Sequence, residues 1–469
     1  SVLLPDWEVL VIFSPENSPS KSDNYFCIFE TLEVTRAKYA GGIRFPDRET
    51  FSCILPERAR RRRTFNQPVI SKDPESYPQK RRGEWLPMLR SSYLVYESLT
   101  TEEDVVLFVK GVNSRQGINR NPSEFRCIFG GDAANGVRTS VTVSAQEIFR
   151  CKRPNITAVS PPSMFPLKIS LEIVEENHAV PSVAYFTSKR TVDSPAGRSL
   201  LCATTMVYNA AKFLREWILF HSEIGIEKFL LYDNGSDDDL GATVRRLASE
   251  GFDVSVYRWP WPKTQEAGFS HSSLYSSSVC KWMVFMDVDE FLYSRSWRSH
   301  SKPSRSLLRR LIASHPKSPQ SKLGQITVPC FEFGPSGRKT HPVTGVTQGY
   351  NCRRRSENRH KSLVSLEAVD RSLLNRVHHF DLKPGRVTVK ANPEKMVINH
   401  YKYQAWPEFK SKFRRRASAY VVDWTSKLNS ESQDRTPGLG FDPTEPDDWP
   451  RSFCEVQDTE LRDLTRRWF

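Results

Sequence analysis

The chain has 469 residues, of which 38% are hydrophobic and 26% are charged. This composition is sufficient for a sizeable core and excludes global disorder. The length suggests about three domains, or one large domain with a smaller companion. No apolar run approaches the roughly 18 residues that a membrane helix requires. Lys and Arg total 68 against 54 Asp and Glu, which gives a net charge of +14 and favours either an anionic partner or a plain basic enzyme.

Residues 1–155 are rich in short apolar runs of strand length, with no long helical pattern between them. The last run alternates, with Val137, Val141 and Val143 on one side. We therefore predict a smaller β-rich module, a sandwich or a small barrel. The expected strands are Trp7–Phe13, Tyr25–Phe29, Phe51–Leu55, Tyr93–Tyr96, Val105–Val109, Phe125–Phe129 and Val137–Val143.

The cysteine pattern suggests disulfides rather than zinc. No two of the nine cysteines have CxxC spacing, and an odd number allows four bridges and one free thiol. Cys27, Cys53, Cys127 and Cys151 lie in the β-rich module. We expect two bridges among them, with three connectivities open and core thiols as the alternative.

The basic run Arg58–Arg63 lies in a polar, Pro-containing stretch and is interpreted as an exposed loop. It is either solvated or in contact with an acidic polysaccharide. A nuclear-localisation signal is the poorer alternative, because the sequons at Asn155 and Asn234 fit a secretory compartment.

Residues 156–196 are a connecting segment with expected strands, and residues 197–469 change to alternating strands and helices. This alternation predicts a doubly wound, Rossmann-like α/β domain. Its expected first elements are a strand at Leu201–Val207, a helix at Phe213–His221 that stops at Gly225, a strand at Lys228–Tyr232, a helix at Ala242–Ala248 and a strand at Val254–Tyr257.

Polar residues follow the first two of these strands. Asn209, Asp233 and Asn234 stand where such sheets bind ligands, at the carboxyl ends of strands. They could hydrogen-bond a base or ribose, and a simple turn at Asp233–Gly235 is the alternative.

The sharpest motif is Asp287-Val-Asp289, which follows the apolar strand Trp282–Met286. Residues i and i+2 of extended backbone point to one side, so both carboxylates could reach one divalent ion. Hard oxygen ligands suit Mn²⁺ or Mg²⁺ better than Zn²⁺. Such an ion would stabilise a diphosphate as a leaving group.

Several motifs occur in one order along the second half of the chain, and together they resemble plant members of glycosyltransferase family 92, the family of the pectic β-1,4-galactan synthases. The motifs are Met206–Asn209, Phe213–Trp217, Tyr232–Asp237, Lys263–His271, Asp287–Phe291, Phe333–Gly337, Gly345–Tyr350, Val377–Phe380 and Ile398–Tyr401.

The resemblance implies a GT-A type catalytic domain, a UDP-sugar donor, Mn²⁺ and inversion at the anomeric carbon. It also implies a Golgi-lumen, type II membrane protein whose anchor precedes Ser1, and a β-rich, carbohydrate-binding-like module before the catalytic domain. The implied partners are UDP-galactose and a galactan or pectic oligosaccharide acceptor, and pectin is itself polyanionic. A homo-oligomer is left open.

Carried over by motif, Asp287, Asp289 and His400 would be the metal ligands, with His378–His379 as a competing pair. Gln265 would touch the donor sugar or the diphosphate, with packing as its alternative role. His271 and Lys361 are further candidates for donor contacts. His271 shares the packing alternative, and Lys361 belongs, with Arg353–Arg355, to a basic loop that either closes over the phosphates or is solvated.

Inversion requires a carboxylate that accepts the proton of the acceptor hydroxyl. Glu332, after the strand Ile326–Val328, is the first choice, and Glu357, Glu367 and Asp423 remain open. The predicted function is galactosyl transfer that extends pectic β-1,4-galactan. The alternatives are a related transferase that uses UDP-arabinopyranose and a non-catalytic glycan-binding protein. A nucleic-acid-binding protein is a further alternative that the sequence disfavours, because the basic residues are scattered among loops rather than aligned with an aromatic recognition motif.

Overall fold

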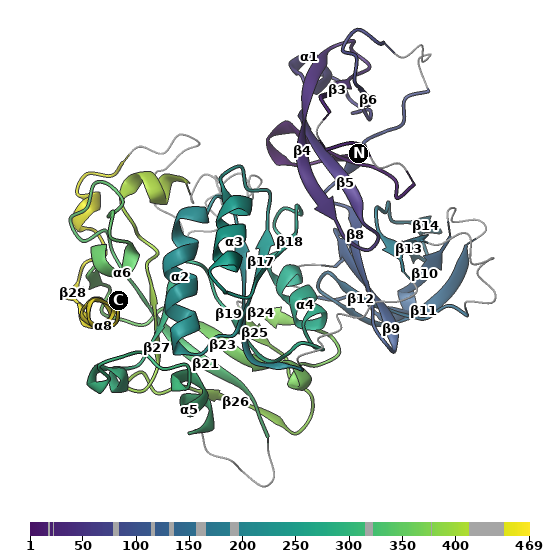
Figure 1. The fold of residues 1–469 in the computed structure, drawn as a ribbon. Helices are drawn as coiled ribbons and strands as arrows, with labels where there is room; N and C mark the ends of the chain where they lie inside the picture. The colour runs from purple at the N-terminus through teal and green to yellow at the C-terminus, as the bar shows by residue number, and fades with distance from the viewer. Residues whose placement is uncertain are drawn as a thin grey trace. The chain divides into compact units, whose positions relative to one another are not determined.

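The computed structural model describes residues 1–16, 19–21, 23–77, 84–113, 118–130, 136–155, 166–187, 197–314, 322–376, 378–411 and 445–469. The chain divides into two compact units (Figure 1). Unit 1 comprises Ser1–Thr191, Arg258–Ala267 and Arg371–Leu374, and unit 2 comprises Val192–Tyr257, Gly268–Asp370 and Asn375–Phe469. Within the described ranges, no helix has both the length and the apolar character needed to cross a membrane.

The first sheet of unit 1 has the strand order β6-β3-β4-β5-β2-β1-β7. Its core contains Val9, Phe51 and the disulfide Cys27–Cys53, which joins β3 to β5. The predicted β-rich module is thus confirmed for this part of the chain. The elements are β1 (Val2–Leu3), β2 (Glu8–Ile12), β3 (Tyr25–Ile28), β4 (Val34–Ile43), β5 (Arg48–Ile54), α1 (Glu57–Arg60), β6 (Val69–Ser71) and β7 (Leu89–Arg90).

The second sheet of unit 1 has the order β14-β13-β10-β11-β12-β9-β8, with β15 paired to β13. Cys127–Cys151 joins β10 to β12, so the two disulfides expected in this region are confirmed and their connectivity is settled. The strands are β8 (Leu94–Thr100), β9 (Asp104–Lys110), β10 (Phe125–Phe129), β11 (Val137–Ala145), β12 (Ile148–Lys152), β13 (Leu167–Ile173), β14 (His178–Ala179) and β15 (Tyr185–Phe186). Because β13 pairs with β10, the sheet continues beyond residue 155 into the expected connecting segment.

Two short segments from the second half of the chain belong to unit 1. In Arg258–Ala267, the rings of Trp259 and Trp261 lie 5.9 and 5.3 Å from the ring of Tyr96 on β8. In Arg371–Leu374, the backbone carbonyl of Arg371 accepts a hydrogen bond from Arg150 at 2.6 Å. Removal of residues 1–155 would therefore leave Trp259 and Trp261 without their contact with Tyr96.

Unit 2 is built on a nine-stranded sheet with the order β18-β17-β16-β19-β23-β21-β27-β20, to which β26 adds by pairing with β21. β16 pairs in parallel with both β17 and β19, which confirms the predicted α/β arrangement. The strands are β16 (Ser199–Val207), β17 (Lys228–Asp233), β18 (Val254–Arg258), β19 (Cys280–Phe285), β20 (Glu290–Tyr293), β21 (Lys322–Glu332), β23 (His360–Ser365), β26 (Arg386–Lys390) and β27 (Val397–His400).

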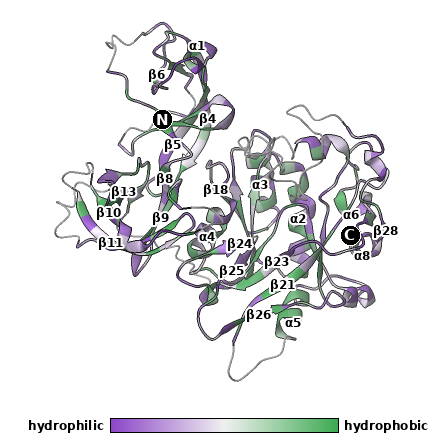
Figure 2. Cartoon of the chain, turned by 180° about the vertical axis from the view of Figure 1, so that it is seen from behind, coloured by the Kyte–Doolittle hydropathy of each residue, from purple (hydrophilic) through white to green (hydrophobic). Residues whose placement is uncertain are grey.

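Helices and short strands complete unit 2. Helix α2 ends where predicted, because Gly225 caps it with a φ of 120°. Figure 2 shows hydrophobic and hydrophilic colours alternating along the strands of this sheet, and Ile326 and Val328 of β21 and Leu363 of β23 belong to the core. The helices are α2 (Ala211–Ile224), α3 (Leu240–Ser249), α4 (Gln265–Tyr275), α5 (Leu307–Ala313), α6 (Val346–Gly349) and α8 (Glu460–Trp468), and the short strands are β22 (Cys352–Arg353), β24 (Asn375–Arg376), β25 (His379–Phe380) and β28 (Val456–Gln457).

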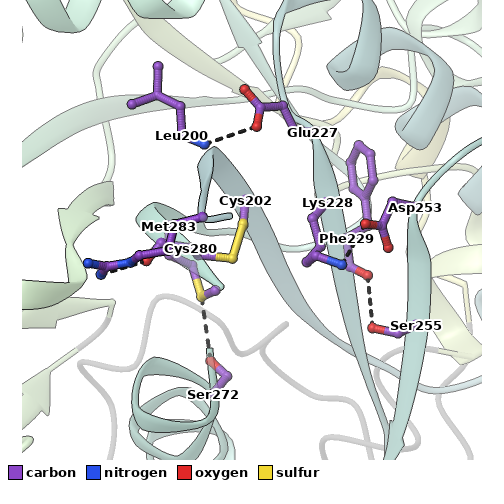
Figure 3. Close-up of a disulfide and its surroundings, with 11 residues drawn as sticks. Leu200, Cys202, Glu227, Lys228, Phe229, Asp253, Ser255, Ser272, Cys280 and Met283 are labelled. Carbon is purple, nitrogen blue, oxygen red and sulfur yellow. Dashed lines mark hydrogen bonds and ion pairs between the residues drawn. A yellow bond between two sulfur atoms is a disulfide. The ribbon is translucent and has the colours of Figure 1, made fainter. Parts of the chain in front are cut away.

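Two further disulfides stabilise unit 2. Cys202–Cys280 joins β16 to β19 near the ends where both strands begin (Figure 3). Cys352–Cys454 joins β22 to the segment before β28. Cys330 on β21 is the free, buried cysteine, so the nine cysteines form four bridges and one thiol.

Candidate functional site

The predicted metal-binding motif lies at the carboxyl end of β19. The carboxylate of Glu290 accepts a hydrogen bond from the backbone N–H of Asp287 at 2.8 Å, which closes the turn that contains Asp289. β20 and β21 then flank β27, so that Glu290 and Glu332 are both in register with His400. Side chains in register point to the same face of a sheet, so these three form a row across three strands.

Lys361 is the cation at the centre of this site. Its Nζ lies 3.0 Å from Asp287 Oδ2, 3.0 Å from Glu290 Oε1 and 2.7 Å from His378 Nε2. The contacts with Asp287 and His378 are hydrogen bonds, and the contact with Glu290 is an ion pair. The prediction of a flexible basic loop is wrong for Lys361, because this residue is buried on β23.

The charges in this cluster shift one another's protonation. Burial raises the pKa of Asp287, but Lys361, His378 and His400 lower it, Lys361 most strongly. Together these three hold that pKa below its ordinary value. Burial raises the pKa of Glu290 to about 8, and the neighbouring aspartates add to the shift. Burial, and then Lys361, keep the pKa of His378 well below its ordinary value, so His378 accepts from Lys361 as a neutral imidazole.

Asp289 and His400 fit a divalent cation better than the predicted three-residue set does. Asp289 Oδ2 lies 3.8 Å from His400 Nε2, and bond lengths of about 2.1 Å allow two ligand atoms of one ion to lie up to about 4.2 Å apart. Across the part of the chain that the structure describes, no three His, Cys, Asp or Glu side chains are grouped to hold a metal. Asp287 instead contacts Lys361. A mixed oxygen–nitrogen pair suits Mn²⁺ better than Mg²⁺.

Glu332 is buried and surrounded by donors. Its Oε1 accepts from Lys402 at 2.6 Å and from Asn358 at 3.0 Å, whereas Oε2 has only longer contacts, to Tyr403 at 3.4 Å and Arg354 at 3.6 Å. Oε2 is therefore the oxygen better able to accept a proton. Sequence reasoning missed Lys402, because the chain turns after β27: the backbone N–H of Lys402 donates to the carbonyl of His400 at 2.8 Å.

The other proposed bases are less favourably placed. Glu357 forms an exposed ion pair with Lys390 at 2.6 Å. Glu367 pairs with Arg386 and follows the carboxyl end of β23, whereas Lys361 lies near the start of that strand. Asp423 lies outside the described residues.

The residues after β16 and β17 are joined in one turn network. Asn209 Oδ1 accepts from the backbone N–H of Asp237 at 2.7 Å, and Asp233 Oδ1 accepts from that of Ser236 at 2.8 Å. The backbone N–H of Asn234 donates to the carbonyl of Val207 at 2.9 Å. The structure thus brings Asn209, Asp233 and Asn234 together. Asn209 Oδ1 and Asp233 Oδ1 both accept hydrogen bonds within this turn, which favours a structural role for these two oxygens.

Gln265 and His271 lie on α4, at its first turn and its middle. The ring of His271 is fully buried and shares a hydrogen bond of 2.8 Å with the hydroxyl of Tyr232. Tyr257 and Tyr275 pack against the same ring. This burial favours packing over a donor contact for His271.

The motif Gly345–Tyr350 has a structural role that involves Glu216 of α2. The Glu216 carboxylate accepts hydrogen bonds from the backbone N–H groups of Val346 and Thr347 at 2.8 and 3.0 Å, at the start of α6. Gly345 has a φ of 94°, and a Cβ at this position would lie 2.5 Å from that carboxylate. The close approach requires glycine.

Gly345→Ala is expected to lower the free energy of unfolding by about 2–4 kcal/mol, since it adds a clash to backbone strain. Gly337→Ala is the matched control: its φ is 75°, but a Cβ there would meet nothing within 4 Å. We expect it to cost only about 1 kcal/mol. Urea denaturation measures both, and equal losses would contradict the role of Glu216.

The chain is similar to known proteins over most of its length. Residues 198–436 match the family Glycosyltransferase family 92. A family 92 protein of Arabidopsis thaliana is 42% identical over 380 residues, which cover 79% of this chain and 65% of that protein. A family 92 protein of Ricinus communis is 36% identical over 481 residues, which cover 99% of this chain and 82% of that protein. The chain thus spans about two thirds of the Arabidopsis relative, 65% of its length.

Solved structures are similar only at a low level. A mannosyltransferase of Pyrobaculum calidifontis, in complex with GDP-Man and Mn²⁺, is 12% identical with a TM-score of 0.31, over 50% of this chain and 66% of that one. Glucosyl-3-phosphoglycerate synthase of Mycobacterium tuberculosis, with Mn²⁺ and UDP, is 13% identical with a TM-score of 0.24, over 59% and 98%. Similarity this low carries no argument about ligands.

Proposed function

Because the chain belongs to glycosyltransferase family 92, we propose that it transfers galactose from UDP-galactose to a cell-wall glycan, with inversion at the anomeric carbon. The specific form of the proposal is extension of the β-1,4-galactan side chains of pectin. The observation that supports metal-dependent transfer is the pair Asp289–His400 at the end of β19, where Lys361 contacts Asp287. UDP-arabinopyranose is the alternative donor, because it differs from UDP-galactose by one hydroxymethyl group.

Asp289 and His400 would hold the cation, Mn²⁺ rather than Mg²⁺. The cation supplies positive charge that stabilises the departing diphosphate. Lys361 keeps Asp287 ionised and fixes its orientation through the contact of 3.0 Å. The same ammonium adds positive charge to a site that must accept an anionic donor.

Polar groups at the strand ends would orient the rest of the donor. Asn209, Asp233 and Asn234 follow adjacent parallel strands, the place where nucleotides bind in doubly wound sheets. Gln265 begins α4 and is proposed to contact the donor sugar. His271 is not included, because its ring is fully buried.

Glu332 is proposed to accept the proton of the acceptor hydroxyl through Oε2. Glu332→Gln is expected to lower kcat by roughly 100-fold or more, which is the typical contribution of a general base, and to leave UDP binding unchanged. Glu357→Gln is the matched control, since it makes the same change at an exposed ion pair. Initial rates and calorimetric titration with UDP measure these effects. A near-normal rate for Glu332→Gln would move the base elsewhere.

A panel of UDP-sugars offered with galactan oligosaccharides, with Mn²⁺ or with a chelator, tests the function as a whole. We expect turnover with UDP-galactose and Mn²⁺, and β-1,4 linkages in the product. Binding of galactan without turnover, unaffected by Asp287→Ala, would favour the alternative of a non-catalytic glycan-binding protein. Turnover only with UDP-arabinopyranose would favour the alternative donor.

The Golgi lumen is the proposed compartment. Four disulfides are consistent with an oxidising environment, in which such bonds persist. A glycosyltransferase that extends a wall polysaccharide would also find its nucleotide-sugar donor in that lumen.

A further inference from the structure

The basic run Arg58–Arg63 has no part in the site described above. From Glu57 to Arg63 the chain contains five arginines and one glutamate. The run starts in α1 and continues in the turn that follows (Figure 1). Four of its arginines are exposed, and within the described ranges their side chains form no ion pair or hydrogen bond: Arg58, Arg61, Arg62 and Arg63. Their positive charge is therefore not compensated by a neighbouring carboxylate.

An exposed tryptophan lies beside this run. The side chain of Trp7 is 40% exposed. The guanidinium of Arg60 lies 5.3 Å from the centre of its ring, and Arg60 also donates to the carbonyl of Leu55 at 2.7 Å. Phe65 contacts the ring edge-on at 5.9 Å. Arg60 and Phe65 thus hold the indole in one orientation and leave part of it open to solvent.

The backbone at Trp7 is strained. Asp6 and Trp7 have φ values of 59° and 63°, in the left-handed region that residues other than glycine disfavour. Burial of the indole does not offset the free-energy cost of this backbone conformation, because the Trp7 side chain is partly exposed. Strained backbone of this kind is concentrated at ligand sites, where it presents a side chain in a fixed position.

We propose that Trp7, Arg58 and Arg61–Arg63 form a binding site for an anionic polysaccharide whose charge is carried by sugar carboxylates. Planar guanidinium groups bind carboxylates with two parallel hydrogen bonds. The indole offers an apolar surface for the C–H face of a pyranose ring. A uronate polymer combines both features, whereas a sulfated polymer or a nucleic acid lacks the sugar carboxylates. Binding needs neither donor nor metal, so the proposal does not rest on the transfer activity.

The test is equilibrium binding of the full chain to polygalacturonate at low salt. Changing the four arginines to glutamine, as Arg58→Gln with Arg61→Gln, Arg62→Gln and Arg63→Gln, is expected to weaken binding roughly tenfold or more, the combined effect of four exposed ion pairs. The matched control makes the same charge change at four exposed arginines of α3 and α5: Arg245, Arg246, Arg309 and Arg310. We expect this control to change affinity by less than about twofold. An equal loss in both variants would overturn the proposal, because net charge alone would then explain binding.

Trp7→Asn tests the aromatic part of the site. Asparagine tolerates the left-handed backbone, so the substitution removes the indole without new strain. We expect binding to weaken by roughly threefold to tenfold, with an unchanged salt dependence because no charge is lost. A fully methyl-esterified polymer, which lacks the carboxylates, is expected to bind at least about tenfold more weakly. The proposal is overturned if Trp7→Asn binds polygalacturonate like the unchanged chain, or if dextran sulfate or single-stranded DNA binds equally tightly.

Discussion

Replacing Asp289 with asparagine is expected to lower kcat by at least about 1000-fold, because the loss of one metal-binding carboxylate removes several kcal/mol of transition-state stabilisation. The fold should be retained, since asparagine has the same shape. The backbone carbonyl of Asp289, which accepts from Tyr401 at 2.8 Å, is not altered. Initial rates at saturating UDP-galactose and Mn²⁺ measure kcat, and paramagnetic resonance of free Mn²⁺ measures metal binding independently of turnover.

Asp253→Asn is the matched control for this experiment. Asp253 is exposed and precedes β18, and its ion pair with Lys228 at 2.5 Å contributes little in water. We expect this control to bind Mn²⁺ and to turn over like the unchanged chain. If Asp289→Asn also kept Mn²⁺ binding and rate, metal-dependent chemistry at the Asp289–His400 pair would be wrong.

Lys361→Met is expected to lower kcat by at least about 100-fold and to reduce the free energy of unfolding at neutral pH by about 3–5 kcal/mol, the usual cost of breaking a buried ion pair. The substitution leaves Asp287 and Glu290 without the ammonium that lies 3.0 Å from each. Lys390→Met, at an exposed pair with Glu357, is the control and should cost less than about 1 kcal/mol.

The pH dependence of this variant follows from the sign of the Asp287 shift. With Lys361 present, the pKa of Asp287 lies below its ordinary value of 3.8, so the stabilisation is present above that value and is lost as the pH falls through the folded-state pKa. Without Lys361, burial and the charge of Asp289 both raise the pKa of Asp287. The acidic limb of the rate profile should therefore move to higher pH in Lys361→Met. An unmoved limb would contradict the role given to Lys361.

The fold of unit 2 was largely predictable because its local signals agree with its tertiary structure. Apolar residues of α2 recur at helical spacing, and Gly225 ends that helix as predicted. The family and the α/β fold are confirmed. β4 in unit 1 was missed because its apolar residues form no run: Arg36 and Lys38 alternate with buried Ala37, and the register shifts before Gly41.

The candidate site was only partly predictable. Short motifs predict Asp287, Asp289 and His400 as one group. The structure places Asp289 3.8 Å from His400, whereas Asp287 contacts Lys361, and no group of three metal-binding side chains occurs among the described residues. The contact between Lys361 and Asp287 joins residues 74 positions apart, and it depends on the pairing of β19 with β23. No local pattern encodes that register, so the sequence alone predicts a loop at Lys361.

The bond Cys202–Cys280 has a consequence for chain connectivity. It links two adjacent strands of one sheet across 78 residues, which include the exposed turn Asp237–Asp239. A single proteolytic nick in that turn would release no fragment until a reductant is added.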